Sequence, residues 1–438
     1  MSVNRRSPGS RNARASRTKA TPPVVPADMR ALVLDGVGFD HLKVRRVPIP
    51  RPGPRQLLAR VDAAGVCTSM LKIIDQGPGH PMLFGWDVTK YPLILGDEAS
   101  ITLVEIGEQL RGRYHFGERY VIQSAVDSAP INHLERYRNN GKGIERLGVG
   151  YTLPGQLAEY VLIGEEIIGA KCLLPVPDKA LPYSHAAVCE PLGCVISAQD
   201  HHMHLVQKTP LSPRKALKGL RPGGITIIIG AGTMGRMHVD IALSSRPRVV
   251  VSADHHDERL AQVRDLFGAR AKKVGATLYT VNTTTTDLKE FVGALPNWRG
   301  ADDVIVSVGS AQAIETAQDL LARYAVLHLF GGLKRGEDRV CLNTTVVHYQ
   351  ETNLTGSAGG TPWDVAHGLE LMAAGKLDPG AHITGIGDLD HVPIFLQMVK
   401  ARNIAGRAVV YPHRRATEIL KVRSWSAKDE RAYLAGEP

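Results

Sequence analysis

The chain has 438 residues, 43% hydrophobic and 22% charged, a balance that is ordinary for a globular protein large enough for two hydrophobic cores. No apolar run approaches the roughly 20 residues of a membrane-spanning helix, so neither a membrane helix nor a membrane partner is expected. The net charge of +10 does not indicate nucleic-acid binding, because the basic excess is concentrated at one end.

This basic end covers residues 1–27, which hold no acidic residue and six basic ones: Arg5, Arg6, Arg11, Arg14, Arg17 and Lys19. They contribute +6, so the other 411 residues carry only +4, and no nucleic-acid partner is expected. Because the segment has almost nothing to bury, we expect a disordered basic tail over residues 1–28. An organelle transit peptide, or an upstream start codon with Met29 as the functional start, stays open as another interpretation.

The five cysteines are scattered and odd in number, and none form a Cys-x-x-Cys pair: Cys67, Cys172, Cys189, Cys194 and Cys341. This pattern supports neither a disulfide framework nor a four-cysteine structural zinc site. A protein of the reducing cytoplasm is the expectation.

From Met29 to Ile163 the sequence consists of short β-type runs broken by glycine and proline. The runs cover residues 31–34, 57–61, 101–106, 119–122 and 157–163. This spacing predicts a small, irregular, β-barrel-like domain.

Between residues 218 and 333 strands alternate with helices. The expected strands are 225–229, 248–251, 302–308 and 325–330, and the expected helices begin at Met234 and cover 257–268 and 312–324. Helical connections of this length predict right-handed crossovers and a parallel, doubly wound sheet, hence an α/β fold.

After residue 358 a helix over 363–377 and a strand over 406–412 return to mixed character. The simplest organisation is a discontinuous domain with the doubly wound domain inserted into it. We therefore expect the tail over 1–28, a catalytic domain over 29–195, a dinucleotide-binding domain over 196–357, and the remainder of the catalytic domain with a C-terminal tail over 358–438.

A glycine-rich turn directly follows the apolar strand 225–229 and opens a helix; its residues are Gly230, Gly232, Thr233, Met234 and Gly235. Glycines in this position let the backbone approach a pyrophosphate, which the free N–H groups of the helix then bind. The turn predicts a dinucleotide site.

Asp254 ends the next strand, where a carboxylate would accept hydrogen bonds from the adenosine ribose hydroxyls. It would repel a 2′-phosphate, so NAD(H) is expected rather than NADP(H). His255 and His256 follow and could soften this preference.

Motifs in a characteristic order resemble the medium-chain dehydrogenases of the zinc alcohol dehydrogenase type over roughly residues 29–412. They are GVCTS (65–69), LGDEA (95–99), GERY (117–120), EPL (190–192) and the glycine-rich turn. The stretches 119–124, 190–198 and 346–360 resemble the L-sorbose-1-phosphate reductase branch more closely. The resemblance implies a Rossmann domain and a discontinuous GroES-like domain.

This resemblance also implies one catalytic zinc ion, held by Cys67, Asp97 and Glu190, with Glu98 beside it as an exchangeable carboxylate. The open metal position would take the substrate oxygen. No four-cysteine lobe lies between residues 120 and 155, so no structural zinc is expected. Ser69 matches the hydroxyl that passes the alcohol proton outward.

Three positions depart from the family pattern. Asp97 stands where a histidine is usual, Met70 replaces an aspartate that braces the site, and Lys72 occupies the place of the terminal proton acceptor. A thiolate and two carboxylates would leave a net charge of −1 with Zn²⁺, making it a weaker Lewis acid. Zinc on a carboxylate-rich set, Mn²⁺ or Mg²⁺ instead, and loss of the metal with Lys72 and Ser69 handling protons all stay open.

The implied activity is hydride transfer between NAD(H) and a sugar, a polyol or a sugar phosphate, in a homodimer or homotetramer. A metal-free reductase of the quinone or enone type and a non-catalytic NAD(H)-binding redox sensor are the rival functions. A further histidine group, His201, His202 and His204, is expected on a surface helix rather than at a metal.

Overall fold

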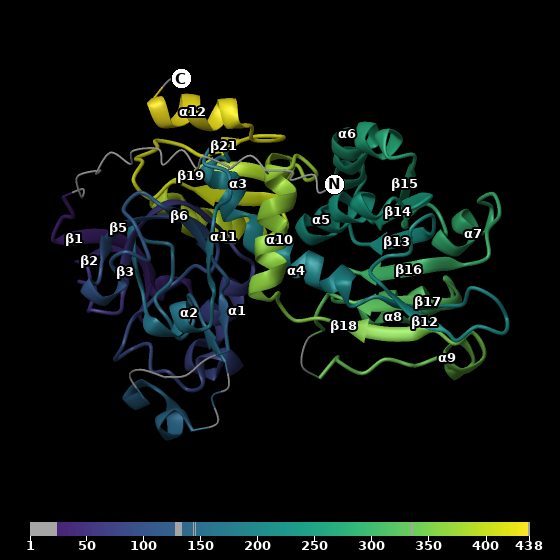
Figure 1. The fold of residues 1–438 in the computed structure, drawn as a ribbon, viewed down its shortest axis with the longest axis horizontal. Helices are drawn as coiled ribbons and strands as arrows, with labels where there is room; N and C mark the ends of the chain where they lie inside the picture. The colour runs from purple at the N-terminus through teal and green to yellow at the C-terminus, as the bar shows by residue number, and fades with distance from the viewer. Residues whose placement is uncertain (1–23, 128–133, 143, 145, 334–335, 437–438) are drawn as a thin grey trace, which may run out of the picture.

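A computed structural model describes residues 24–127, 134–142, 144, 146–333 and 336–436. Most of the expected basic tail therefore lies outside the described residues. The chain forms two lobes, a β-rich lobe built from both ends of the sequence and an α/β lobe built from its middle (Figure 1). Among the described residues, none of the helices is both long and apolar enough to cross a bilayer.

A six-stranded parallel sheet forms the centre of the α/β lobe. In spatial order its strands are β15 (Thr277–Asn282), β14 (Val249–Asp254), β13 (Ile225–Ile229), β16 (Ala301–Val306), β17 (Leu321–Leu329) and β18 (Asn353–Gly356). Taken along the chain this is the order 3-2-1-4-5-6, the arrangement of dinucleotide-binding domains. The predicted doubly wound sheet is confirmed.

Helices cover both faces of this sheet, and each face has its own apolar core. The helices are α5 (Thr233–Ala242), α6 (Asp257–Lys273), α7 (Leu288–Gly293), α8 (Ala311–Gln318) and α9 (Thr344–Tyr349). The predicted helix over 312–324 is too long, because strand β17 already begins at Leu321. Leu321 pairs with Ala301 of β16, and Gly300 permits this approach because a Cβ there would lie 2.4 Å from the Ala322 nitrogen.

The β-rich lobe contains an eight-stranded sheet that joins the two ends of the chain. Its strands are β10 (Leu173–Pro175), β6 (Arg119–Ile122), β5 (Ala99–Ile106), β3 (Leu57–Gly65), β20 (Arg407–Val410), β19 (Ile383–Gly387), β21 (Leu420–Lys421) and β9 (Tyr160–Ile163). Val409 and Val410 of β20 pair with the end of β3, so the C-terminal segment completes the N-terminal sheet. The discontinuous β-rich domain is thus confirmed.

Smaller elements complete this lobe. A second sheet holds β2 (Leu42–Pro48), β1 (Asp28–Leu34) and β4 (Leu93–Ile94), and β7 (Ala125–Val126) pairs with β8 (Leu147–Gly148). The helices are α1 (Ser69–Gln76), α2 (Glu165–Gly169), α3 (Tyr183–Ala187), α11 (Val392–Lys400) and α12 (Ala427–Ala435).

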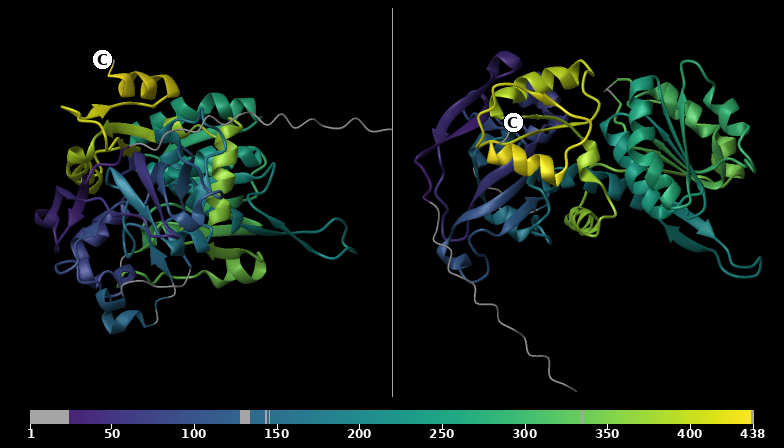
Figure 2. Two further views of the ribbon diagram at one scale, coloured as in Figure 1. Left: turned by 60° about the vertical axis from the view of Figure 1, so that its left-hand side comes forward. Right: turned by 90° about the horizontal axis from the view of Figure 1, so that it is seen from above.

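Two helices lie between the lobes, α4 (Cys189–Asp200) and α10 (Pro362–Ala373) (Figure 1). They pack closely because Gly193 of α4 faces Val365 of α10, and Gly368 of α10 faces Cys189 of α4. Beyond α4 the chain forms the hairpin β11 (Met203–Val206) and β12 (Lys215–Lys218), which projects from the α/β lobe (Figure 2).

Candidate functional site

The glycine-rich turn joins β13 to α5, and each of its glycines has a different geometric role. Gly230 has a φ of 106°, and Gly235 approaches it so closely that a Cβ would lie 1.7 Å from the Gly230 oxygen. Gly232, by contrast, faces open space, since the atom nearest to its ideal Cβ position is 4.0 Å away on Arg259. The turn thus packs helix against strand and leaves a cradle in front of the N-terminus of α5.

Asp254 lies at the end of β14, beside this turn. Its Oδ2 accepts a hydrogen bond from the Ala231 N–H (2.7 Å), and its Oδ1 accepts from the His256 N–H (3.0 Å) and lies 2.8 Å from His256 Nδ1. Burial alone would raise the pKa of Asp254, but the hydrogen bonds from Ala231 and His256 bring it below its usual value. The carboxylate is therefore ionised and held in place before any ligand arrives.

A cavity of about 120 Å³ opens in front of Gly232 and Thr233, and three arginines line it: Arg259, Arg402 and Arg407. A helix N-terminus and three guanidinium groups together suit a doubly charged anion. The cradle and this charge fit the pyrophosphate of a dinucleotide. Thr233 also donates a hydrogen bond to the Gly406 oxygen (3.2 Å), which holds the turn against the β-rich lobe. Met234 packs into the apolar core between the lobes.

A thiol and two carboxyl groups meet behind this cavity. Cys67, Asp97 and Glu98 each offer a ligand atom, and these three atoms lie within 4.8 Å of one another. Cys67 follows β3, whereas Asp97 and Glu98 lie in the short connection before β5, and the β3–β5 pairing brings the two segments together. Gly65 makes room for Glu98, because a Cβ there would lie 2.3 Å from Glu98 Oε2.

The charges in this group are incompletely balanced. Burial raises the pKa of the Cys67 thiol and of the Asp97 carboxyl, and for Cys67 the negative charges of Asp97 and Glu98 add to the effect. Burial also raises the pKa of Glu98 to about 7, although the ion pair of Glu98 with the buried Arg407 opposes this shift. One guanidinium group therefore cannot compensate a thiolate and two carboxylates together.

A divalent cation fits these residues. Asp97 Oδ2 accepts a hydrogen bond from the Ser69 hydroxyl (3.1 Å), but Asp97 Oδ1 and Glu98 Oε2 are buried without a hydrogen-bond partner. Unpaired buried carboxylate oxygens are unfavourable unless a cation or a donor meets them. A thiolate with two carboxylates is also an acceptable zinc donor set.

Glu190 lies in the first turn of α4, outside the group of three. Its Oε1 accepts a hydrogen bond from the Ser124 hydroxyl (3.0 Å) and a longer contact from the Cys194 thiol (3.6 Å). Burial raises the pKa of Glu190 to about 8, and the charges of Asp97 and Glu98 contribute. Glu190 thus faces the same buried charges, while its role as a ligand stays a prediction.

Ser69 begins helix α1 next to Asp97, and Lys72 lies one turn further along this helix, where it is exposed. Burial lowers the pKa of His80, and the charge of Lys72 lowers it further, so the ammonium group lies near His80. Ser69 therefore contacts the acidic group directly, whereas Lys72 stands at its solvent side.

Two residues near the group were not anticipated. Arg407 belongs to the predicted strand 406–412, but the strand pattern gave no sign that its side chain reaches Glu98. The pKa of Tyr151 is raised by burial and then by the charges of Asp97 and Cys67, and a hydrogen bond with Ser69 acts in the opposite direction. Only the three-dimensional pairing of distant segments could have identified either residue.

Two family models match the chain: "Alcohol dehydrogenase GroES-like domain" over residues 53–178 and "Zinc-binding dehydrogenase" over residues 233–374. A protein of Escherichia coli (strain K12), "Uncharacterized protein YggP", is 31% identical over 370 residues, which are 83% of this chain and 82% of that protein. The chain belongs to the zinc-type medium-chain alcohol dehydrogenase family.

Other members of this dehydrogenase family are similar over most of their length. A mannitol-1-phosphate 5-dehydrogenase of Aliivibrio fischeri is 29% identical (86% of this chain, 85% of that protein), and an L-sorbose 1-phosphate reductase of Klebsiella pneumoniae is 27% identical (85% and 86%). A zinc-binding dehydrogenase of Sinorhizobium meliloti, solved bound to NADP, has the same fold, with a TM-score of 0.69 at 24% identity (88% of this chain, all of that chain).

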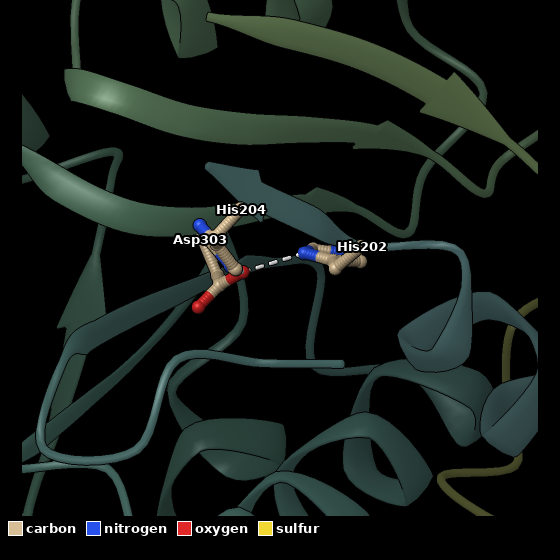
Figure 3. A group of neighbouring side chains, drawn as sticks. All are labelled: His202, His204 and Asp303. Carbon is tan, nitrogen blue, oxygen red and sulfur yellow. Dashed lines mark hydrogen bonds and ion pairs between the residues drawn. The ribbon is translucent and has the colours of Figure 1, made fainter. Parts of the chain in front are cut away.

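A second group of possible metal ligands in this dehydrogenase is far from the surface. His202, His204 and Asp303 are fully buried, with ligand atoms within 4.8 Å (Figure 3). The expected surface helix holds for His201, which is exposed at the C-terminal end of α4, and is wrong for the other two. His202 lies just after α4, and His204 lies in β11, where the strand packs over β17.

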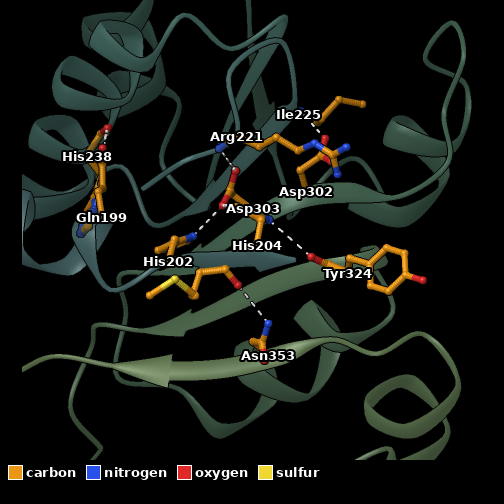
Figure 4. Close-up of polar contacts among 11 residues, drawn as sticks. Gln199, His202, His204, Arg221, Ile225, His238, Asp302, Asp303, Tyr324 and Asn353 are labelled. Carbon is orange, nitrogen blue, oxygen red and sulfur yellow. Dashed lines mark hydrogen bonds and ion pairs between the residues drawn. The ribbon is translucent and has the colours of Figure 1, made fainter. Parts of the chain in front are cut away.

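Hydrogen bonds, rather than a metal, join the members of this second group, although His202 Nε2 is buried without a hydrogen-bond partner. His202 Nδ1 and His204 Nε2 lie 2.6 and 2.9 Å from Asp303 Oδ1, too close together for a metal ion between them. Asp303 Oδ2 accepts from the Arg221 N–H (2.9 Å) (Figure 4). His204 Nδ1 faces the Tyr324 oxygen at 3.3 Å, so both of its nitrogens face acceptors, an arrangement that favours the protonated ring.

Proposed function

We propose that this dehydrogenase transfers a hydride between C4 of the nicotinamide of NAD(H) and a hydroxyl-bearing or ketone carbon of a polyol, a sugar or a sugar phosphate. The observation that carries the proposal is that the cofactor cavity and the acidic group lie on two sides of the same residues. Val66 and Thr68, on either side of Cys67, line the cofactor cavity, and so does Arg407, the partner of Glu98. A cofactor bound at Gly232 would therefore end beside the acidic group.

Cys67, Asp97 and Glu98 would hold one zinc ion, with Glu190 as the further ligand that the family resemblance implies. When bound, the ion supplies Lewis-acid polarisation of the substrate oxygen. Arg407 neutralises one carboxylate and is placed to bind the cofactor pyrophosphate as well. Ser69 holds the transferable proton on a hydroxyl that is hydrogen-bonded to Asp97. Lys72 lies on the solvent side, where its ammonium group would first lose a proton to water and then receive this one.

The choice of NAD(H) rests on Asp254. Its carboxylate is ionised and fixed at the end of β14, where it would repel a 2′-phosphate. Arg259, 3.8 Å from Asp254 Oδ2, tempers this preference rather than reversing it, because its charge is shared with the carboxylate.

A sugar-type substrate is supported by relatives whose names describe dehydrogenases and reductases of polyol and sugar phosphates. We also propose association into a homodimer or homotetramer through β18, which pairs only with β17 among the described strands and leaves one edge open. Five unpaired cysteines suit the cytoplasm as the compartment.

The test is metal content and turnover measured on the same sample, purified without chelator. We expect about one zinc per chain, and NAD⁺ reduction with a panel of polyols and polyol phosphates. Cys67→Ser and Glu98→Gln should each lower kcat/KM by at least about 100-fold, of the order seen when a positioned charge in an active site is removed. Cys341→Ser is the matched control, because this thiol is exposed and distant from the site.

Other outcomes would decide against this proposal. Full turnover in metal-free protein would favour the quinone or enone reductase. Tight NADH binding without turnover on any substrate of the panel would favour the redox sensor.

A further inference from the structure

A cavity of about 290 Å³ lies between two loops of the β-rich lobe. One wall is the segment after α1, with His80, Phe84 and Gly85, and the other wall carries Arg138 and Lys142. Its volume lies near the lower end of the range of small-molecule sites, enough for one end of a ligand.

The cavity adjoins the candidate site through two aromatic rings. His80 packs against Tyr151 with a distance of 5.7 Å between the ring centroids, and Tyr151 contacts Ser69, whose hydroxyl donates to Asp97. A substrate whose oxygen lies at the acidic group would have to pass Ser69 and Tyr151 to reach this cavity.

Positive charge is the main chemical feature of the cavity. Arg138 and Lys142 line it. Among the described residues, no acidic side chain lines it and neither cation forms an ion pair. The field of Lys72 also reaches its wall, because Lys72 lowers the pKa of His80. Three cations without a local counter-charge attract an anion.

The backbone is shaped to hold Arg138 in this wall. Gly85 has a φ of 77°, and a Cβ at this position would lie 2.6 Å from Arg138 Cβ and 3.1 Å from Arg138 Nε. The Arg138 N–H donates to the Phe84 oxygen (3.0 Å). Any larger residue at position 85 would displace the arginine, so the turn and the guanidinium group fit each other.

His80 adds a neutral donor to the two cations. Its Nδ1 accepts a hydrogen bond from the Met82 N–H (3.2 Å), so Nε2 carries the ring proton. The nitrogen that remains on this cavity-lining ring can only donate. One guanidinium group, one ammonium group and one imidazole N–H form a donor set for phosphate oxygens.

We propose that Arg138, Lys142 and His80 bind the phosphate group of the substrate, while the carbon that exchanges hydride lies at the acidic group. This assignment rests on the proposed function and narrows its substrate class to open-chain polyol phosphates and the corresponding keto-sugar phosphates. Arg138 and Lys142 determine specificity and take no part in hydride transfer. Their contribution should therefore affect substrate binding and leave the chemical step unchanged.

The test compares two substrates that differ only in a terminal phosphate, mannitol and mannitol 1-phosphate, with the full-length, metal-loaded enzyme. The wild type should have a KM for mannitol 1-phosphate that is at least about tenfold lower than its KM for mannitol. This factor corresponds to the contribution of one charge-assisted contact. Arg138→Gln combined with Lys142→Gln should remove this difference, raising KM for the phosphate only and leaving kcat and the values for mannitol unchanged.

Two controls distinguish the loss of a positive charge that lines this cavity from the loss of a positive charge elsewhere on the surface. Arg146→Gln removes an exposed arginine in the same region that pairs with Asp127 and does not line the cavity, and it should leave both KM values unchanged. Inorganic phosphate should compete with mannitol 1-phosphate in the wild type, and this inhibition should weaken at least about tenfold in the double variant.

Each failure identifies its own cause. Turnover of neither substrate, nor of any other polyol or polyol phosphate in the panel, would overturn the proposed function and this assignment with it. A wild type without preference for the phosphate, or a double variant that keeps the preference, would overturn the assignment alone and leave the dehydrogenase function standing.

Discussion

Gly232 and Gly235 belong to one turn, but the space around their α-carbons differs completely. Gly235 touches the Gly230 carbonyl, while Gly232 faces an open cradle. A methyl group added at Gly235 would meet a backbone atom, whereas one added at Gly232 would meet the bound pyrophosphate. Substitutions at the two positions therefore distinguish an effect on stability from an effect on cofactor binding.

Gly235→Ala should destabilise the protein by about 1–3 kcal/mol, because β13 and α5 must move apart. Gly232→Ala should change stability by less than about 0.5 kcal/mol, yet weaken NADH binding by at least about tenfold. Denaturant unfolding and fluorescence titration with NADH measure the two effects. Equal loss of stability in both variants would show that the turn has only a packing role.

Asp303 is the second residue whose environment makes a sharp prediction. Burial would raise its pKa, but the hydrogen bonds and charges of His202 and His204 lower it to about 2. Burial would lower the pKa of His204, but the hydrogen bond and the charge of Asp303 raise it above its usual value. Asp303→Asn should cost about 3–5 kcal/mol, as expected when one member of a buried ion pair is removed. Asp319→Asn, at an exposed pair with Lys289, should cost less than about 1 kcal/mol.

The sign of the pH dependence follows from the two shifts. The contribution of Asp303 to the free energy of unfolding is complete above its unfolded pKa of about 3.9 and is lost as the pH falls towards 2. The contribution of His204 is complete below its unfolded pKa of about 6.5 and is lost as the pH rises through its higher pKa in the folded protein. Stability from this pair should therefore be greatest between about pH 4 and 6.5. Urea unfolding of wild type and Asp303→Asn from about pH 2 to about pH 9 tests it, and a difference that stays constant over this wider span would contradict the ionised pair.

At the level of elements, helices α4 and α10 are joined through glycines. A Cβ at Gly193 would lie 2.7 Å from Val365 Cγ2 and 3.3 Å from its backbone, so neither helix can yield without moving the other. Gly268, in the interior of α6, has no heavy atom within 4 Å of its ideal Cβ position.

A glycine-to-alanine substitution is therefore expected to have opposite effects on stability at these two positions. Gly193→Ala should destabilise the protein by about 1–3 kcal/mol through overpacking, and Gly268→Ala should stabilise it by about 0.5–1 kcal/mol through helix propensity. Thermal unfolding of both variants beside the wild type is sufficient. A stabilised Gly193→Ala variant would mean that the two helices are not in close contact.

Local sequence patterns predicted many of these elements and failed where pairing competes with propensity. The apolar strands 225–229 and 119–122 were predicted with the bounds that β13 and β6 have. The helix beginning near residue 312 was extended too far, because nothing local shows that Leu321 pairs with Ala301. The histidines after α4 were placed on the surface, because their buried partner Asp303 is about 100 residues away.

On the scale of the whole molecule, the candidate site depends on how the fold brings together segments that are far apart in the sequence. The sequence identified Cys67, Asp97 and Glu98 through motifs, and the structure brings their ligand atoms together. It gave no indication of Arg407, because an arginine in a strand has no local signature of its partner. The cofactor cavity likewise has no local sequence signature, because Gly232 and Arg407 come from different lobes.

The pairing of Glu98 with Arg407 spans 309 positions, and β20 must be made before it can form. On the ribosome this separation corresponds to roughly 15–60 s at about 5–20 residues per second. During that interval the nascent chain holds a cysteine and two acidic side chains without their arginine, and β3 lacks its β20 neighbour. Maturation of the site, including any capture of metal, therefore follows the synthesis of β20, after the α/β lobe has had time to fold.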